Sequence, residues 1–369
     1  MSKKKLHVKL ITVTFKESSG MGLIEYGVRL LKALKQFDKD LVVSTRTIVA
    51  EKLFTSVNKK LLRDYDEYPT TNNKRKKSQR PDILHYLEPA TMAIDSSLLI
   101  KPKNTRVVAT IHDLDSIRRV KKVGFFRYTK NKNPMIGLTN AFLNSIITFV
   151  SQTGIKRAMR NSDHIVCVSE KTREEVIRYL KVSPSKCSVV YPIIAPEFKR
   201  MKKNKDKNKI VIGHISSYLY NKNAETLIKA FQNTKNPKLE LRLYGGKLPF
   251  NIGNDSRIKY FGHVPNKELP RVFNSFDVFV FPSYWEGFGM PIMEAKRCKV
   301  PVITYAKGQL PDAVKSNTIQ FKNERHLTEI LEKRGWEKAD VNKAYLDTKK
   351  TEPRYVAKKM DEVYRKLLK

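Results

Sequence analysis

The stretch Glu286-Gly287-Phe288-Gly289-Met290-Pro291-Ile292-Met293-Glu294, taken with the run before it, decides the fold of this chain. That run, Val278–Phe281, is apolar and is followed by Pro282-Ser283, as expected of a buried strand that ends at a turn. The glycines let the backbone approach a ligand closely, and Pro291 suits the first position of a helix. We expect the amides and the dipole at such a helix start to bind an anion, for example a diphosphate.

The two glutamates of this stretch are expected to serve the same ligand. We place Glu286 in the loop before the helix and Glu294 in the first turn of the helix. Both can then face the crevice at the carboxyl end of a parallel sheet, where doubly wound folds bind ligands. A carboxylate that accepts hydrogen bonds from two vicinal hydroxyls suits a ribose, and a second carboxylate suits a hexose.

The rest of the chain repeats strands and helices in alternation. Residues 6–15 are rich in β-branched residues, a glycine turn follows, and apolar residues then recur at helical spacing. Alternation of this kind favours a parallel, doubly wound α/β sheet, and 369 residues suit two such domains. We expect further strands at 41–44, 83–86, 107–111, 164–168, 188–191, 210–215, 240–244, 258–261, 278–281, 301–304 and 318–321.

The domain limits follow from a polar run, 199–209, which is almost free of apolar residues and is typical of a linker. We predict an N-terminal Rossmann-like domain over 1–198 and a C-terminal Rossmann-like domain over 199–350, followed by residues 351–369.

The stretch from Glu286 to Glu294 resembles the E-x7-E signature of the retaining family 4 glycosyltransferases, which have the GT-B fold. The resemblance implies two Rossmann-like domains that face each other across a cleft, an acceptor-side domain over 1–198 and a nucleotide-sugar-binding domain over 199–350. It also implies that residues 351–369 form a helix that packs back on the N-terminal domain. It implies that Glu286 lies beside the donor sugar, that Glu294 binds the ribose, and that Gly287, Phe288, Gly289 and Met290 contact sugar and phosphate. Since the family uses these glutamates for binding, the two-carboxylate chemistry of glycosidases is a poor guide here.

Further donor contacts are implied by shorter matches. Gly20 and Gly22 resemble the glycine turn whose amides face the donor phosphates, and Val264 lies in a segment like the one that holds the nucleotide base. Lys222 resembles the lysine of the family's R-x4-K phosphate clamp, where a cation stabilises the departing nucleoside diphosphate. The arginine usual five residues earlier is absent, and Ser217 stands near its position.

The acceptor is expected on the N-terminal side. His112, in an HD segment after a predicted strand, resembles a family residue near the donor sugar or acceptor, so His112, Lys222 and Glu286 form the expected catalytic set. Next comes a basic segment, 118–132, with interleaved aromatics and no acidic residue. It could dock on an anionic bilayer, where each Lys or Arg contributes ~1 kcal/mol, bind nucleic acid, or cover the acceptor cleft as a solvated loop. The patch residues are Arg118, Arg119, Lys121, Lys122, Phe125, Phe126 and Arg127.

Composition limits the partners. With 73 Lys+Arg against 36 Asp+Glu, the net charge is +37 and favours anionic partners. Three scattered cysteines and seven histidines form no metal-ligand spacing, so we expect no metal and no cofactor beyond the nucleotide-sugar substrate. No apolar run reaches the ~20 residues of a membrane span. We expect a cytoplasmic protein, either soluble or peripheral on the inner face of the membrane.

The sequence therefore predicts a hexosyltransferase that uses a UDP- or GDP-sugar and a glycan or lipid-linked acceptor. A soluble sugar or glycogen-type synthase is the alternative within enzymes. A nucleic-acid-binding protein is the alternative from another class, although no nucleic-acid module is recognised and no specific nucleic acid is expected. An inactive transferase-like protein is the third, because of the missing arginine.

Overall fold

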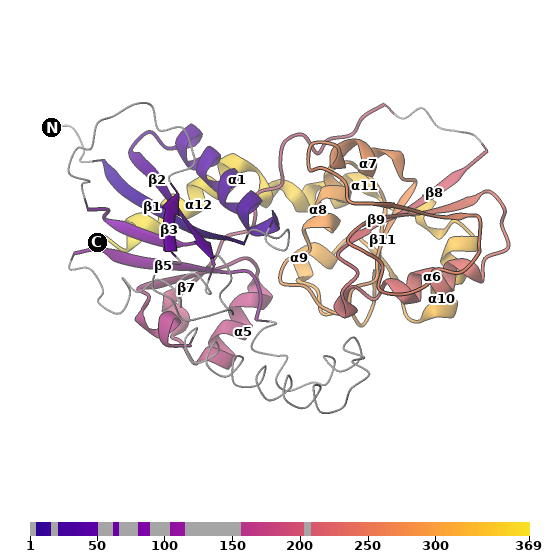
Figure 1. Cartoon of the computed structure of the whole chain (residues 1–369), viewed down its shortest axis with the longest axis horizontal. Coiled ribbons are helices and arrows are strands. Elements are labelled where there is room, and N and C mark those ends of the chain that lie inside the picture. The colour runs from indigo at the N-terminus through magenta and orange to yellow at the C-terminus, as the bar shows by residue number, and fades with distance from the viewer. Residues whose placement is uncertain are drawn as a thin grey trace. The chain divides into compact units, whose positions relative to one another are not determined.

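The computed structural model describes residues 5–15, 21–50, 62–65, 80–88, 104–114, 156–202 and 208–369, as drawn in Figure 1. The chain divides into two compact units. The first contains Met1–Ile193 with Pro353–Lys369, and the second contains Ile194–Glu352. The first boundary thus lies five residues before the one that the polar run indicated. Contacts of the segment just before the polar run explain this position. The Ile194 amide donates to the Thr351 carbonyl at 3.1 Å, and the Phe198 ring packs edge-on against Phe273 at 5.9 Å between centroids, so this segment belongs to the second unit.

The first unit is built on a seven-stranded sheet of order β3-β2-β1-β4-β5-β6-β7. All neighbours pair in parallel except β2 and β3, which are antiparallel. The edge strand β3 was not predicted, because its four residues, Leu62–Tyr65, do not alternate between apolar and polar side chains. The elements are β1 Leu6–Phe15, α1 Met21–Phe37, β2 Leu41–Ala50, β3 Leu62–Tyr65, β4 Ile83–Tyr86, β5 Arg106–Ile111, β6 His164–Cys167, α5 Glu170–Leu180, a 3-10 turn Pro184–Lys186, β7 Cys187–Val189 and α12 Pro353–Lys366.

The C-terminal helix α12 belongs to the core of the first unit. Its buried residues Val356, Met360 and Tyr364 share one apolar cluster with β1, β4 and α1. The buried His85 of β4 bonds the Tyr364 hydroxyl at 2.6 Å and the Thr110 hydroxyl at 2.8 Å. The last helix is therefore fixed to the sheet by a polar contact as well as by apolar packing.

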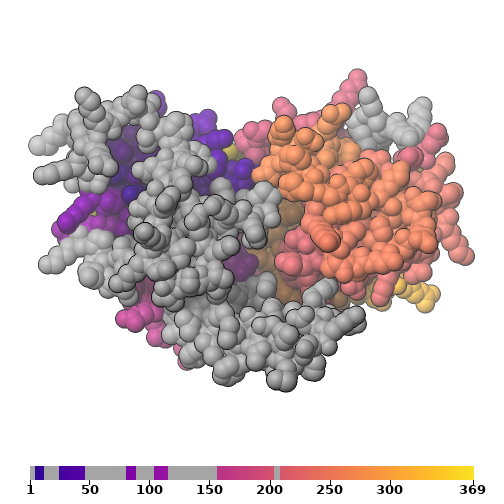
Figure 2. Space-filling view, in the orientation of Figure 1, coloured from indigo at the N-terminus to yellow at the C-terminus, as the bar shows by residue number. Residues whose placement is uncertain are grey.

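The second unit, coloured from rose to yellow in Figures 1 and 2, contains a parallel sheet of order β10-β9-β8-β11-β12-β13. Along β11, Val278 and Val280 join the apolar cluster with α6 and α10, whereas Phe279 packs edge-on against Phe273 of α7. Alternate residues of the strand thus meet helices on opposite faces, as in a doubly wound sheet. The elements are β8 Ile210–Ser216, η5 Tyr220–Lys222, α6 Ala224–Gln232, β9 Leu239–Gly245, β10 Ile258–Gly262, α7 Leu269–Ser275, β11 Val278–Phe281, α8 Met290–Arg297, β12 Val302–Tyr305, α9 Asp312–Lys315, β13 Ile319–Phe321, α10 Glu324–Glu332, η6 Gly335–Lys338, α11 Val341–Leu346 and η7 Asp347–Thr351.

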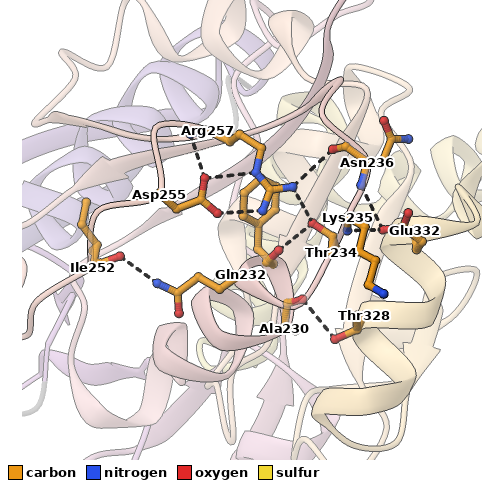
Figure 3. Close-up of polar contacts among 11 residues, drawn as sticks. Ala230, Gln232, Thr234, Lys235, Asn236, Ile252, Asp255, Arg257, Thr328 and Glu332 are labelled. Carbon is orange, nitrogen blue, oxygen red and sulfur yellow. Dashed lines mark hydrogen bonds and ion pairs between the residues drawn. The ribbon is translucent and has the colours of Figure 1, made fainter.

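A polar network holds the amino ends of β9 and β10 (Figure 3). The Arg257 guanidinium binds both oxygens of Asp255, at 3.0 and 2.7 Å, and also the Thr234 hydroxyl at 3.1 Å and the Asn236 carbonyl at 3.2 Å. Its hydrogen bonds lower the pKa of Asp255. This network therefore stabilises one end of the sheet, and the opposite, carboxyl end carries the loops described below.

Buried histidines make the fold sensitive to acid. Loss of hydration on burial lowers the pKa of His85 to about 3 and the pKa values of His112, His164 and His214 to about 4, from 6.5. At a pH between the folded and the unfolded pKa values of these histidines, the unfolded chain binds more protons than the folded chain. The free energy of unfolding must therefore fall as pH drops from ~7 towards ~4.

We therefore expect the urea midpoint to be lower at about pH 5 than at about pH 7.5. His214→Asn should reduce this pH dependence, because it removes one of these buried histidines. Equal pH dependence in wild type and His214→Asn would contradict the assigned cause.

Candidate functional site

The order in which the chain adds strands to the second sheet reverses between the neighbouring strands β8 and β11, which is the switch point of this sheet. Strands β9 and β10 extend the sheet on one side of this pair, and β12 and β13 extend it on the other. Loops that leave the carboxyl ends of two such strands diverge to opposite faces, which opens a crevice for ligands. The loops in question are 217–223 after β8 and 282–289 after β11.

An ion pair joins these two loops. The Lys222 ammonium lies 2.8 Å from one carboxylate oxygen of Glu286 and 2.9 Å from the other. Both side chains are mostly buried, with 18% of the lysine and 12% of the glutamate exposed. Two residues that are 64 positions apart are thus brought together at the switch point of the sheet, where doubly wound folds bind ligands.

Asparagines that the sequence did not single out hold the same loops in place. The side-chain amide of Asn221 donates to the Trp285 carbonyl at 3.3 Å, and the side-chain amide of Asn223 donates to the Pro282 carbonyl at 3.1 Å. Asn223 has a φ of 52°, a left-handed conformation that asparagine tolerates better than most residues. An asparagine directly after Lys222 was a usable signal for this turn.

A third loop, 306–311 after β12, contacts the loop that carries Glu286. The Gln309 amide donates to the Tyr284 carbonyl at 2.7 Å, and the Glu286 amide donates to the Gln309 carbonyl at 3.2 Å. Gly308 allows this approach, because a Cβ there would lie 2.6 Å from the Ser283 carbonyl oxygen. The backbone around Glu286 is therefore fixed by hydrogen bonds to the loop after β8 and to the loop after β12.

Helix α8 begins one residue earlier than expected and carries Glu294 further along. Gly289, at φ 102°, caps the helix, so Met290 is its first residue and Pro291 its second. The first turn holds no acidic residue, and Glu294 lies in the second turn with 7% of its surface exposed. Its placement in the first turn was wrong, because a left-handed glycine and not the proline sets the helix start.

The remaining donor-side residues occupy the same end of the sheet. Gly287 and Phe288 stand in the loop before α8, with Phe288 buried at 5% exposure. Val264 is half-buried and follows β10, which ends at Gly262 in a left-handed conformation with a φ of 70°. Their contacts with a donor stay predictions.

The loop after β8 is anchored by a neutral histidine. His214 Nδ1 donates to the Val280 carbonyl at 2.9 Å, so Nε2 accepts from the Ser216 hydroxyl at 2.9 Å. Burial, with Lys222 nearby, lowers the pKa of His214 to about 4. Ser217, the residue near the position of the expected arginine, is exposed and carries no charge.

In the first unit, His112 follows β5. Its Nε2 donates to the Leu87 carbonyl at 2.9 Å, and its ring packs edge-on against Tyr26 at 4.7 Å between centroids. Since burial lowers its pKa to about 4, the ring is neutral near pH 7 and Nδ1 can accept a hydrogen bond. This is compatible with the predicted contact to a sugar hydroxyl, which stays a prediction.

Other first-unit predictions fall largely outside the described residues. Gly22 lies in the first turn of α1, whereas Gly20 lies outside the described residues. The patch Arg118, Arg119, Lys121, Lys122, Phe125, Phe126 and Arg127 also lies outside them.

Neither a metal cluster nor a membrane span occurs within the described ranges. No group of three or more His, Cys, Asp and Glu side chains among the described residues is placed to hold a metal ion. No helix formed by these residues is both long and apolar enough to cross a bilayer. A metal-free reaction stays a prediction.

Two glycosyltransferase family models together match most of the chain. Residues 36–198 match the family model described as Glycosyltransferase Family 4, and residues 196–334 match the model described as Glycosyl transferases group 1. The second match contains Lys222, Glu286 and Glu294 together.

Individual relatives agree with the family models. O-antigen chain mannosyltransferase B of Escherichia coli is 46% identical over 57 residues, which are 15% of each chain. O-antigen chain mannosyltransferase RfbU of Salmonella typhimurium is 22% identical over 298 residues, 77% of this chain and 78% of the relative. Several other curated relatives are matched over less than half of their own length.

Solved structures show the same fold. HepE of Anabaena, in complex with UDP and glucose, superposes with a TM-score of 0.66 at 14% identity, covering 96% of this chain and 99% of that one. The predicted α/β fold with two Rossmann-like domains is confirmed, apart from the unpredicted antiparallel strand β3. The chain therefore has the GT-B fold and belongs to the glycosyltransferase family that these two models, Glycosyltransferase Family 4 and Glycosyl transferases group 1, describe.

Proposed function

We propose that this glycosyltransferase moves a hexose from a UDP- or GDP-sugar to an acceptor hydroxyl with retention of anomeric configuration. The observation that carries the proposal is the Lys222–Glu286 ion pair, built from the loops after β8 and β11 at the switch point of the second sheet. A cation and a carboxylate held side by side suit the two ends of the bond that breaks, the departing phosphate and the sugar ring.

Each residue has a role that its chemistry allows. Lys222 donates hydrogen bonds to the leaving phosphate and offsets the charge that develops there. Glu286 accepts hydrogen bonds from hydroxyls of the donor sugar. Glu294, in the second turn of α8, accepts hydrogen bonds from the ribose, and Val264 lies against the base. His112 accepts a hydrogen bond from a sugar or acceptor hydroxyl through Nδ1.

The donor class and the acceptor class draw support from relatives. HepE, with the same fold, was solved with UDP and glucose, and further relatives are named O-antigen chain mannosyltransferases or a phosphatidylinositol N-acetylglucosaminyltransferase subunit. We therefore propose a glycan or lipid-linked acceptor, met at an anionic membrane surface on the cytoplasmic side. The basic segment 118–132 supplies the positive charge for that surface.

A donor panel tests this function. Purified protein is incubated with UDP-glucose, UDP-N-acetylglucosamine, UDP-galactose, GDP-mannose and GDP-fucose, with a bacterial glycolipid extract in anionic or neutral vesicles. We expect one donor to release its nucleoside diphosphate, faster with anionic than with neutral vesicles, and the product to keep the donor's anomeric configuration by NMR.

The arms of this experiment separate the alternatives. Release that is indifferent to vesicles and faster with a soluble sugar acceptor favours a soluble synthase. An inverted product refutes retention. No release from any donor, together with salt-sensitive binding to DNA or RNA, favours the nucleic-acid-binding alternative.

A further inference from the structure

The Lys222–Glu286 ion pair at the switch point does not balance the negative charge of a nucleoside diphosphate. A nucleoside diphosphate carries more than one negative charge, yet Lys222 is already matched by Glu286 at 2.8 and 2.9 Å, so the pair has no net charge. Ser217, in the same loop, is exposed and uncharged. A further cation at the carboxyl end of this sheet is needed to hold such an anion.

The loop after β9 lies directly against Ser217. The Gly246 amide donates to the Ser216 carbonyl at 2.9 Å, and a Cβ on Gly246 would lie 3.0 Å from the Ser217 carbonyl oxygen. Gly245, at φ 117°, is closer still, since a Cβ there would lie 1.9 Å from the Ser216 carbonyl oxygen. Gly245 is therefore required for this contact, and at Gly246 a larger residue would be tightly packed against Ser217.

Aromatic hydroxyls fix the same backbone. The Tyr260 hydroxyl donates to the Gly246 carbonyl at 2.8 Å, and the Tyr218 hydroxyl donates to the Tyr244 carbonyl at 3.0 Å. The next residue is Lys247, which is exposed and has no carboxylate partner in the part of the chain that the structure describes. Its backbone is thus held next to Ser217 while its charge stays available.

One other lysine has to be compared with it. Lys307 follows β12, on the far side of β11, and is also exposed. Its loop, however, packs against Ser283 and the Glu286 backbone, which is the side assigned to the sugar. Lys247 stands beside the β8 loop that carries Lys222, the side assigned to the phosphates.

We propose that Lys247, presented by the Gly245-Gly246 turn, binds the diphosphate of the donor and supplies the net positive charge that the Lys222–Glu286 pair lacks. This inference rests on the proposed function and names a further binding residue for it. Lys247 contributes charge to donor binding and is assigned no step in bond breaking.

Calorimetric titration of the full chain with UDP, GDP, uridine and guanosine tests the proposal. We expect Lys247→Ala to weaken diphosphate binding about tenfold, less at high salt, and to leave nucleoside binding unchanged. The matched control is Lys238→Ala, which removes an exposed lysine at the opposite end of β9 and should change neither. Ser217→Arg, added to Lys247→Ala, should restore diphosphate binding by placing a cation in the adjacent loop.

The outcomes distinguish the two proposals. If the wild type binds UDP or GDP and Lys247→Ala binds it equally well, the inference about Lys247 is wrong while the proposed function stands. The inference is equally wrong if Lys307→Ala weakens binding and Lys247→Ala does not. A wild type that binds neither diphosphate overturns both.

Discussion

Lys222→Met is expected to slow release of the nucleoside diphosphate from the donor by two to three orders of magnitude. Removing one preorganised donor from a developing negative charge costs about 2.7–4 kcal/mol of transition-state stabilisation. Lys222 is preorganised, because Glu286 holds its ammonium at 2.8 and 2.9 Å and the Phe281 ring lies 5.9 Å away. The rate is measured at saturating donor, so that weaker binding does not imitate slower chemistry.

Two control variants separate chemistry from folding. Lys229→Met removes an exposed lysine of α6, a few residues further along, and should keep the full rate. Lys222→Arg keeps the charge and should recover part of the rate. A Lys222→Met protein that folds and turns over at the wild-type rate would show that the leaving group is stabilised elsewhere.

Glu294→Gln is expected to weaken donor binding about a hundredfold. Hydrogen bonds to a charged acceptor are worth about 1.5–3 kcal/mol each, and a ribose offers two hydroxyls to one carboxylate. Glu294 is only 7% exposed, so little water is available to replace the lost acceptor. Glutamine keeps the size of the side chain, which spares the packing of α8.

The measurement is a titration of the variant with the donor found for the wild type. Glu329→Gln, on the exposed face of α10, is the matched control, and we expect it to bind as the wild type does. Unchanged affinity in Glu294→Gln would refute the assignment of Glu294 to the ribose.

Strand positions were predictable from the sequence, because apolar runs of β-branched residues between turns depend on short-range patterns. The predicted strands 6–15, 83–86 and 278–281 coincide with β1, β4 and β11, and most others differ by a residue or two at one or both ends. Strand β3 was missed because four residues with two charges carry too little pattern. Strand β2 runs further than predicted, to Ala50, where it pairs with β3.

The site was predictable in its parts but not in its pairing. Glu286 and Lys222 were each identified in loops that follow strands, yet periodicity does not tell which loops meet across 64 residues. Sheet order decides this, since β8 and β11 become neighbours only when the chain crosses back. The turn that holds Glu294 depends on the left-handed Gly289, a conformation that the spacing of glutamates does not reveal.

The central claim, that the switch point between β8 and β11 binds a nucleotide sugar, is tested most directly by thermal unfolding of the wild type with each nucleotide sugar of the panel. A ligand at a hundred times its dissociation constant stabilises the folded state by about 2.7 kcal/mol. We predict that one UDP- or GDP-sugar raises the melting temperature and that Glu294→Gln loses this rise at the same ligand concentration. An unchanged melting temperature with every nucleotide sugar would contradict the claim.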